Sequence, residues 1–110
     1  MAQLARERTE PAGTVVIRQG QVGKEVYLLE EGVVEVFREN AGADQFLAAL
    51  SAPAFFGERV LLDPERIRTA SVKAMSDLRL LVIGVDSFLA FLRRFPSLKD
   101  KLRDVFVERI

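Results

Sequence analysis

The sequence predicts a mainly β domain, a sandwich or a barrel, with helices at its C-terminal end. Short segments rich in β-branched and aromatic residues recur through most of the chain, and glycine or polar turns separate them. Near the C-terminus the apolar residues change to helical spacing. Closely spaced short strands are typical of sandwiches and barrels. We therefore expect a single domain over residues 1–110, with strands over 13–84 and helices over 86–110.

The composition fits one globular core. The chain has 110 residues, of which 49% are hydrophobic and eight are Phe, enough for a core without disulfides or metal. Sixteen basic residues balance sixteen acidic ones, so the chain has no electrostatic footprint for nucleic acid. No signal peptide is recognisable, and no apolar stretch approaches the ~20 residues that span a bilayer. We expect a cytoplasmic protein with neither nucleic acid nor membrane as a partner of this chain.

The first third of the chain contains a polar arm and three strands. Residues 1–10 are polar and mildly helical, and we expect a short N-terminal helix or a frayed arm there. Strands begin after the Pro11-Ala12-Gly13 turn, and further glycines punctuate them. The predicted strands are residues 14–18, 24–30 and 33–38.

The next strands form two antiparallel pairs. Residues 40–44 read as the tip of a hairpin, from which residues 45–51 return. A second pair, residues 68–74 and 78–83, is expected around the turn at Met75-Ser76-Asp77.

Two helices are predicted at the end of the chain. Asp86 or Ser87 is expected to cap the first, and Pro96 to end it. Ser97 can cap a second helix that runs toward Ile110. Both have an apolar stripe at helical spacing, formed by Phe88, Leu89, Leu92 and Phe95 in the first and by Leu98, Leu102, Val105 and Phe106 in the second.

The residue types present argue against an enzyme. The chain has no His and no Cys, so it cannot build a His-rich metal site of the kind found in β-barrel enzymes, or a hydrolase triad with a His base. Carboxylates such as Asp63, Glu65 and Asp77 fall in apparent turns, where solvated side chains are the rule. We predict no catalytic residue, no metal and no cofactor.

The segment from Phe56 to Ala74 combines groups that suit a cyclic phosphodiester. Gly57 forms a turn, and Glu58 precedes a short apolar segment that resembles the start of a helix. A helix N-terminus offers unpaired N–H groups and a positive dipole end to a phosphate. Arg68 can return on a strand with a guanidinium fork that fits two phosphate oxygens. Glu58 would then accept a hydrogen bond from a sugar hydroxyl.

This segment resembles the phosphate-binding cassette of the cyclic nucleotide-binding domain family, which reads F-G-E, an apolar pair, a variable loop and R-[ST]-A before a strand. The matching residues are Phe56, Gly57, Glu58, Leu61, Leu62, Arg68, Thr69, Ala70 and Val72. The resemblance continues upstream through the structural glycines and downstream through the last strand and the helices. It implies an antiparallel β-roll (a double-stranded β-helix, jelly-roll-like) with a short phosphate-cassette helix and C-terminal helices.

The resemblance also implies a ligand and a mode of signalling. The ligand would be cyclic AMP or cyclic GMP, and its contacts would come from Phe56, Gly57, Glu58, Arg59, Val60, Arg68, Thr69 and Ala70. In some members of the family a threonine at the position of Thr69 contacts a guanine base. The last helix of the family often closes over the base and transmits binding to an attached domain. Alternatively, the helical stripe packs on the roll or on a second subunit.

Two cassette positions depart from the family. Arg59 and Val60 stand where the family has an apolar residue followed by a small one, and the β-branched Val60 falls where backbone N–H groups approach the phosphate. A rival hypothesis is therefore a roll without nucleotide affinity that serves as a dimerisation or docking scaffold. A third class, a DNA-binding regulator, would need a helix-turn-helix after Ile110.

Overall fold

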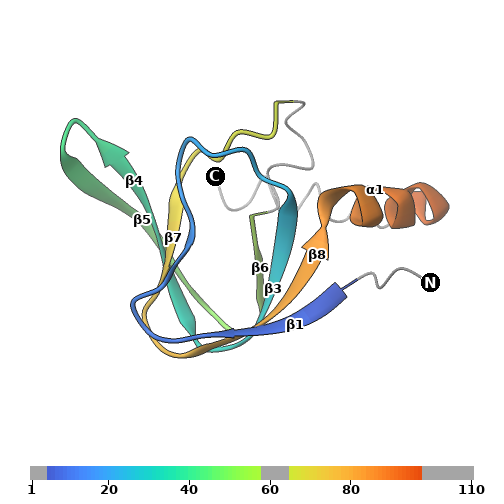
Figure 1. The fold of residues 1–110 in the computed structure, drawn as a ribbon, viewed down its shortest axis with the longest axis horizontal. Helices are drawn as coiled ribbons and strands as arrows, with labels where there is room; N and C mark the ends of the chain where they lie inside the picture. The colour runs from blue at the N-terminus through green and yellow to red at the C-terminus, as the bar shows by residue number, and fades with distance from the viewer. Residues whose placement is uncertain (1–4, 58–64, 98–110) are drawn as a thin grey trace.

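A computed structural model describes residues 5–57 and 65–97 of the chain, and in these residues two antiparallel sheets are followed by a helix (Figure 1). The first sheet has the strand order β1-β8-β3-β6, and the second has the order β2-β7-β4-β5. The strands of the first sheet are β1 (Ala5–Glu10), β8 (Leu78–Gly84), β3 (Glu25–Glu31) and β6 (Ala54–Phe56). Those of the second are β2 (Val15–Ile17), β7 (Ser71–Ala74), β4 (Val33–Asn40) and β5 (Ala43–Ser51).

This arrangement confirms the predicted fold class, a mainly antiparallel β-roll with a C-terminal helix. The main core lies between the two sheets, where Leu29 and Leu80 from one sheet and Val34 from the other are fully buried. A second apolar cluster lies under helix α1 (Val85–Arg94), where Val26 and Ile83 meet Phe88 and Leu92. Since β8 supplies residues to both clusters, it joins the roll to the helix.

The N-terminal prediction is wrong for residues 5–10, which form strand β1 and not a helix. The whole strand pairs with β8, from Ala5 opposite Ile83 to Glu10 opposite Leu78. Mild helix propensity is a weak preference that tertiary pairing overrides. Here the pairing covers an edge of β8 that would otherwise leave its backbone hydrogen-bonding groups unpaired. Residues 1–4 lie outside the described part of the chain.

The six predicted strands are found close to their predicted positions, with two differences, and the three-residue strand β6 is an addition to them. At the β4–β5 hairpin the turn is narrower than predicted, because Ala41 and Gly42 alone carry the positive φ angles, 53° and 84°, that a tight hairpin turn needs. The strand predicted from Arg68 begins only at Ser71. Arg68 pairs instead with an upstream loop: its backbone N–H donates to Gln21 (2.8 Å), and its carbonyl accepts from Gly20 (2.8 Å).

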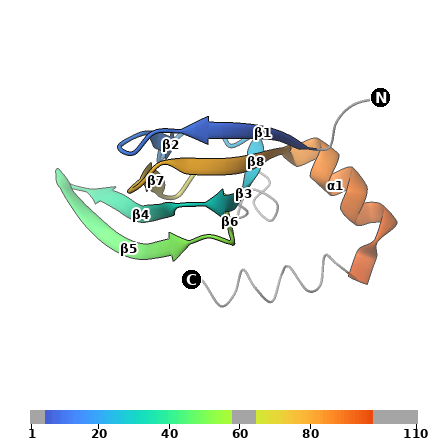
Figure 2. The same ribbon diagram turned by 90° about the horizontal axis from the view of Figure 1, so that it is seen from below.

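Helix α1 starts without the predicted side-chain cap. Gly84 occupies the N-cap position, no side chain bonds there, and Asp86 lies in the first turn. The helix begins directly where β8 ends, and Figure 2 shows it at the end of the molecule opposite the β4–β5 hairpin. It ends at Arg94, shortly before Pro96, as the sequence predicts. Pro96 and Ser97 are already helical, so Ser97 lies inside a second helical segment and is not its cap as predicted. The rest of the second predicted helix, residues 98–110, lies outside the described residues.

The substitution Gly32→Ala tests how closely the turn between β3 and β4 packs against Asp77. The φ of Gly32 is +106°, and a Cβ atom there would lie 2.5 Å from the backbone oxygen of Asp77. Gly42 is the matched control, because its φ is +84° and a Cβ would meet nothing within 4 Å. We expect Gly42→Ala to cost about 1 to 2 kcal/mol of unfolding free energy from backbone strain, and Gly32→Ala to cost clearly more. Urea denaturation measures both; equal losses would contradict the close approach at Gly32.

Candidate functional site

Arg68 is the centre of the candidate site. The residue is 8% exposed, and its guanidinium donates to two backbone carbonyls. Nη1 lies 2.8 Å from the carbonyl oxygen of Gly57, and Nη2 lies 2.6 Å from that of Glu25. Both acceptors are neutral, so these two bonds orient the guanidinium without cancelling its charge. The planar fork is thereby held in a fixed direction, as bidentate recognition of a phosphate requires.

The Gly57 turn is built around this arginine. Gly57 has a φ of +76°, a left-handed conformation that favours glycine. A Cβ atom there would lie 2.9 Å from Arg68 Nη1 and 3.1 Å from Ile17 Cδ1. A larger residue would therefore displace the guanidinium as well as strain the backbone. The two predicted site residues are thus in direct contact, since the Gly57 turn supplies a carbonyl that accepts a hydrogen bond from Arg68.

An aromatic pair supports the arginine from the core. The Tyr27 and Phe56 rings stack with centroids 5.0 Å apart, and Arg68 Cζ lies 6.0 Å from the Tyr27 centroid. The Tyr27 hydroxyl donates to a carboxylate oxygen of Glu25 at 3.2 Å. Burial is the main cause that raises the pKa of Tyr27 above its ordinary value, followed by the nearby Glu25 carboxylate. Phe56, a predicted ligand residue, is 2% exposed and packs in the core.

The remaining predicted site residues are placed as follows. Thr69 is exposed, and its carbonyl accepts from Arg38 Nε at 3.1 Å. Ala70 is partly buried directly before β7. The predicted contacts of Glu58, Arg59 and Val60, and the cassette helix, lie outside the described residues.

A cavity of about 200 Å³ adjoins Arg68. Most of its lining was not predicted from the sequence: it comes from β2 and from the loop that leads into β3. Lining it are Val16, Ile17, Arg18, Gln21, Val22, Gly23, Lys24, Glu25, Tyr27 and Arg68. The glycines at 20 and 23 mark this loop in the sequence, but they do not reveal that it faces Arg68.

The charges around the cavity suit an anion. Among the described lining residues three are cationic, Arg18, Lys24 and Arg68, and one, Glu25, is acidic. Other acids serve the fold: Asp77 Oδ1 accepts from the Ala12 N–H at 3.0 Å, and Asp86 pairs with Arg66 at 3.2 Å. The described residues contain no cluster of potential metal ligands. Nor do they contain a helix long and apolar enough to cross a membrane.

The protein is therefore a β-roll with a site suited to an anionic ligand, since a buried and oriented guanidinium lies at the wall of a cationic cavity. Residues 7–95 match the family described as the cyclic nucleotide-binding domain. The chain is 35% identical over 106 residues to the cyclic AMP receptor protein of Thermus thermophilus, a match that covers 96% of this chain and 49% of that protein. This chain belongs to the cyclic nucleotide-binding domain family.

Other relatives agree with this assignment. The human potassium/sodium hyperpolarization-activated cyclic nucleotide-gated channel 3 is 35% identical over 98 residues, which cover 89% of this chain and 12% of the channel. The crystal structure of the Thermus thermophilus catabolite activator protein superimposes with a TM-score of 0.87 at 34% identity, covering 96% of this chain and 50% of that one. The chain thus spans half or less of the length of these relatives.

Tyr27→Phe tests the polar contact beneath Arg68. At neutral pH we expect a loss of about 0.5 to 1.5 kcal/mol, because the hydrogen bond to Glu25 is removed while the stacking on Phe56 is kept. Folding raises the pKa of the Tyr27 phenol, so the folded state favours the protonated hydroxyl. The contribution of this hydroxyl to the free energy of unfolding is therefore complete below about pH 10 and is lost as the pH rises further. Denaturation between pH 8 and 12 should therefore show a steeper alkaline decline for the wild type. Parallel profiles would contradict this account.

Proposed function

We propose that this chain is a regulatory module that binds a 3′,5′-cyclic nucleotide, cyclic AMP or cyclic GMP, and is not itself an enzyme. The observation that carries the proposal is Arg68, a buried guanidinium held by two backbone carbonyls beside a cationic cavity. A cyclic nucleotide carries a single phosphodiester charge, which one arginine fork matches in both charge and geometry. Membership of the family supports the same ligand class.

The family pattern assigns the other contacts. Glu58 would accept from the ribose hydroxyl, while the backbone around Gly57, Arg59 and Val60 would donate to the phosphate. Thr69 and Ala70 would complete the contacts on the arginine's side, with Thr69 available to a guanine base. Phe56 would act indirectly, by holding Tyr27 against Arg68.

Signalling would pass to the C-terminal helices. Two contacts connect the surroundings of Arg68 to the start of α1. The Val85 N–H donates to the Lys24 carbonyl at 2.9 Å, next to the carbonyl that holds Arg68, and Arg66 pairs with Asp86 on the helix. A shift of Arg68 toward a phosphate would move the neighbouring residues Lys24 and Arg66, and with them the hydrogen bond to Val85 and the ion pair with Asp86. An effector domain beyond Ile110, or a second copy of the chain, would receive the movement.

The second candidate is a roll that serves as a dimerisation or docking scaffold without a nucleotide. The specific observation in its favour is Val60, which stands where the family has a small residue beside the phosphate amides.

Calorimetric titration with cyclic AMP and cyclic GMP in parallel separates these two functions. On the sensor hypothesis at least one nucleotide binds, and at ~100 times its dissociation constant it adds about 2.7 kcal/mol to the free energy of unfolding. The tighter nucleotide identifies the preferred base. A melting temperature unchanged by millimolar amounts of both nucleotides would exclude the sensor and favour the scaffold.

Substitution of Arg68 tests the site itself. We expect Arg68→Ala to weaken nucleotide binding by about thirtyfold or more, because removing one partner of a buried charge pair typically costs ~2 to 5 kcal/mol. Arg68→Lys should restore only part of the affinity, since a point charge cannot make two parallel hydrogen bonds.

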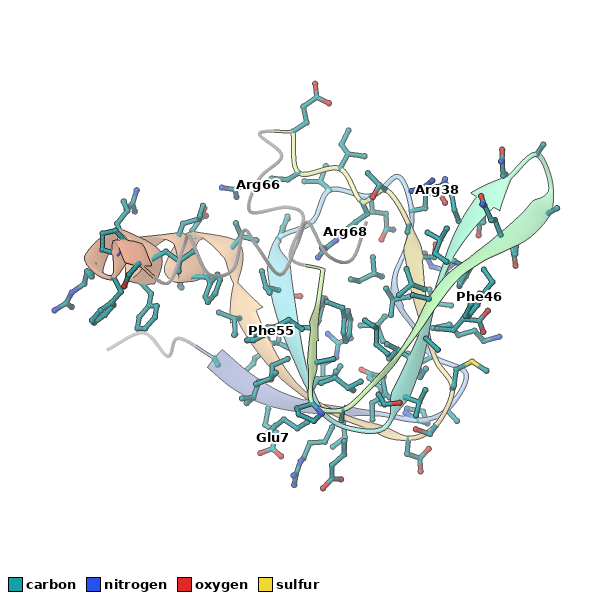
Figure 3. All side chains as sticks on the ribbon, turned by 180° about the vertical axis from the view of Figure 1, so that it is seen from behind. Glu7, Arg38, Phe46, Phe55, Arg66 and Arg68 are labelled. Carbon is teal, nitrogen blue, oxygen red and sulfur yellow. The ribbon has the colours of Figure 1, made fainter. Side chains whose placement is uncertain are left out.

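The matched control is Arg66→Ala. It removes an arginine that lies two residues before Arg68 and whose side chain pairs with Asp86. In Figure 3 both arginines are labelled on the segment that leads into β7. Melting temperatures of all variants show whether they are folded, because Arg68→Ala leaves two partly buried carbonyls without these donors. Wild-type affinity in Arg68→Ala together with a loss in Arg66→Ala would move the site to Arg66.

A further inference from the structure

Glu25 places a negative charge at an otherwise cationic site. It is the single acid among the described residues that line the cavity, where it lies with Arg68, Lys24 and Arg18. Its backbone carbonyl accepts from Arg68 at 2.6 Å, and its carboxylate accepts from the hydroxyl of Tyr27. The ring of Tyr27 in turn lies under the Arg68 guanidinium. An uncompensated carboxylate here would repel an incoming phosphate and compete with it for the arginine.

The structure pairs this carboxylate with an arginine from another strand. Arg6 Nη2 lies 2.7 Å from Glu25 Oε2. Arg6 belongs to β1, which pairs with the far side of β8 from β3. Arg6 is opposite Val82, and Glu25 is opposite Gly84, so the arginine side chain reaches diagonally across β8. The Arg6 side chain is 60% exposed and that of Glu25 is 25% exposed, so the pair lies at the border between solvent and the site.

We infer that Arg6 is a positioning residue of the phosphate site, acting through Glu25. It neutralises the Glu25 carboxylate, which then no longer repels the phosphodiester or competes with it for Arg68. The inference rests on the proposed function. It assigns a binding role to β1, a strand that the sequence did not predict and that contributes no residue to the cavity as described.

Removing Arg6 and removing the Glu25 charge should change the nucleotide affinity in different directions. Arg6→Gln leaves an unpaired carboxylate at the site and should weaken nucleotide binding by about two- to fivefold, the range that exposed ion pairs reach. Glu25→Gln removes the repulsion while the backbone carbonyl still holds Arg68, so its affinity should equal or exceed that of the wild type. The double variant should return to about the wild-type affinity. A pair that served only to hold the backbone geometry of the site would instead weaken binding in both single variants.

The experiment is calorimetric titration of the wild type and the three variants with cyclic AMP and cyclic GMP. Titrations at low salt are repeated at about 1 M salt, where the Debye length falls to ~3 Å. The effect of Arg6→Gln should shrink in high salt, because exposed charges are then screened. The matched control is Arg79→Gln, which removes an arginine of the same sheet that pairs with Glu7 and Glu31. Arg79 lies five residues before Gly84 on β8, about 17 Å away at ~3.4 Å per residue.

The outcomes separate this inference from the proposed function. If the wild type binds neither nucleotide, the proposed function fails and the inference falls with it. If the wild type binds and Arg6→Gln has the same affinity as Arg79→Gln, the function stands and the inference is wrong. Equal weakening by Arg6→Gln and Glu25→Gln, without recovery in the double variant, would also overturn it. Weakening by Arg6→Gln alone, with recovery in the double variant, supports it.

Discussion

The burial of the Arg68 guanidinium is the constraint on which the rest of the site depends. A buried cation needs hydrogen-bond acceptors, and here two of them are backbone carbonyls, one just after β6 and one at the start of β3. These contacts bring together three segments that are distant in the sequence. They also explain why residue 57 is a glycine, since a Cβ atom there would collide with the guanidinium. The same arginine thus organises the fold locally and supplies one of the three positive charges that line the cavity.

Much of the roll could be predicted from the sequence because its strands carry local signals. Period-2 alternation locates β4, and short apolar segments between turn residues locate β3 and β8. The hairpin tip is found because Gly42 supplies one of the positive φ angles. β1 was missed because its signal is not local. Its residues are polar, and it is a strand because β8 offers an unpaired edge. The missing cap of α1 has a similar cause, since β8 runs directly into the helix and leaves no room for a separate turn.

The candidate site could be predicted only in part. The motif identifies Gly57 and Arg68, and the structure brings these two into contact. It does not identify Glu25 and Tyr27, whose positions depend on the pairing of β3 with β6 and β8. Nor does it identify the loop before β3, which reaches Arg68 through long-range backbone hydrogen bonds at Gly20 and Gln21. Arg6 lies one strand further away. Short motifs capture the groups that would touch a ligand, whereas the groups that orient those side chains depend on register.

The direct junction of β8 with α1 limits how this domain can move. Gly84 is the last residue of the strand, Val85 is the first of the helix, and Val85 and Ile83 are both buried in the same apolar cluster. No residue separates the two elements, and Phe88 and Leu92 pack on Val26 and Ile83, so the helix is fixed to the sheet at its start and along one face. Any change in the direction of β8 at Gly84 would therefore have to be matched by α1. The same junction tolerates no inserted residue, because one extra position would rotate the apolar stripe of the helix away from the sheet.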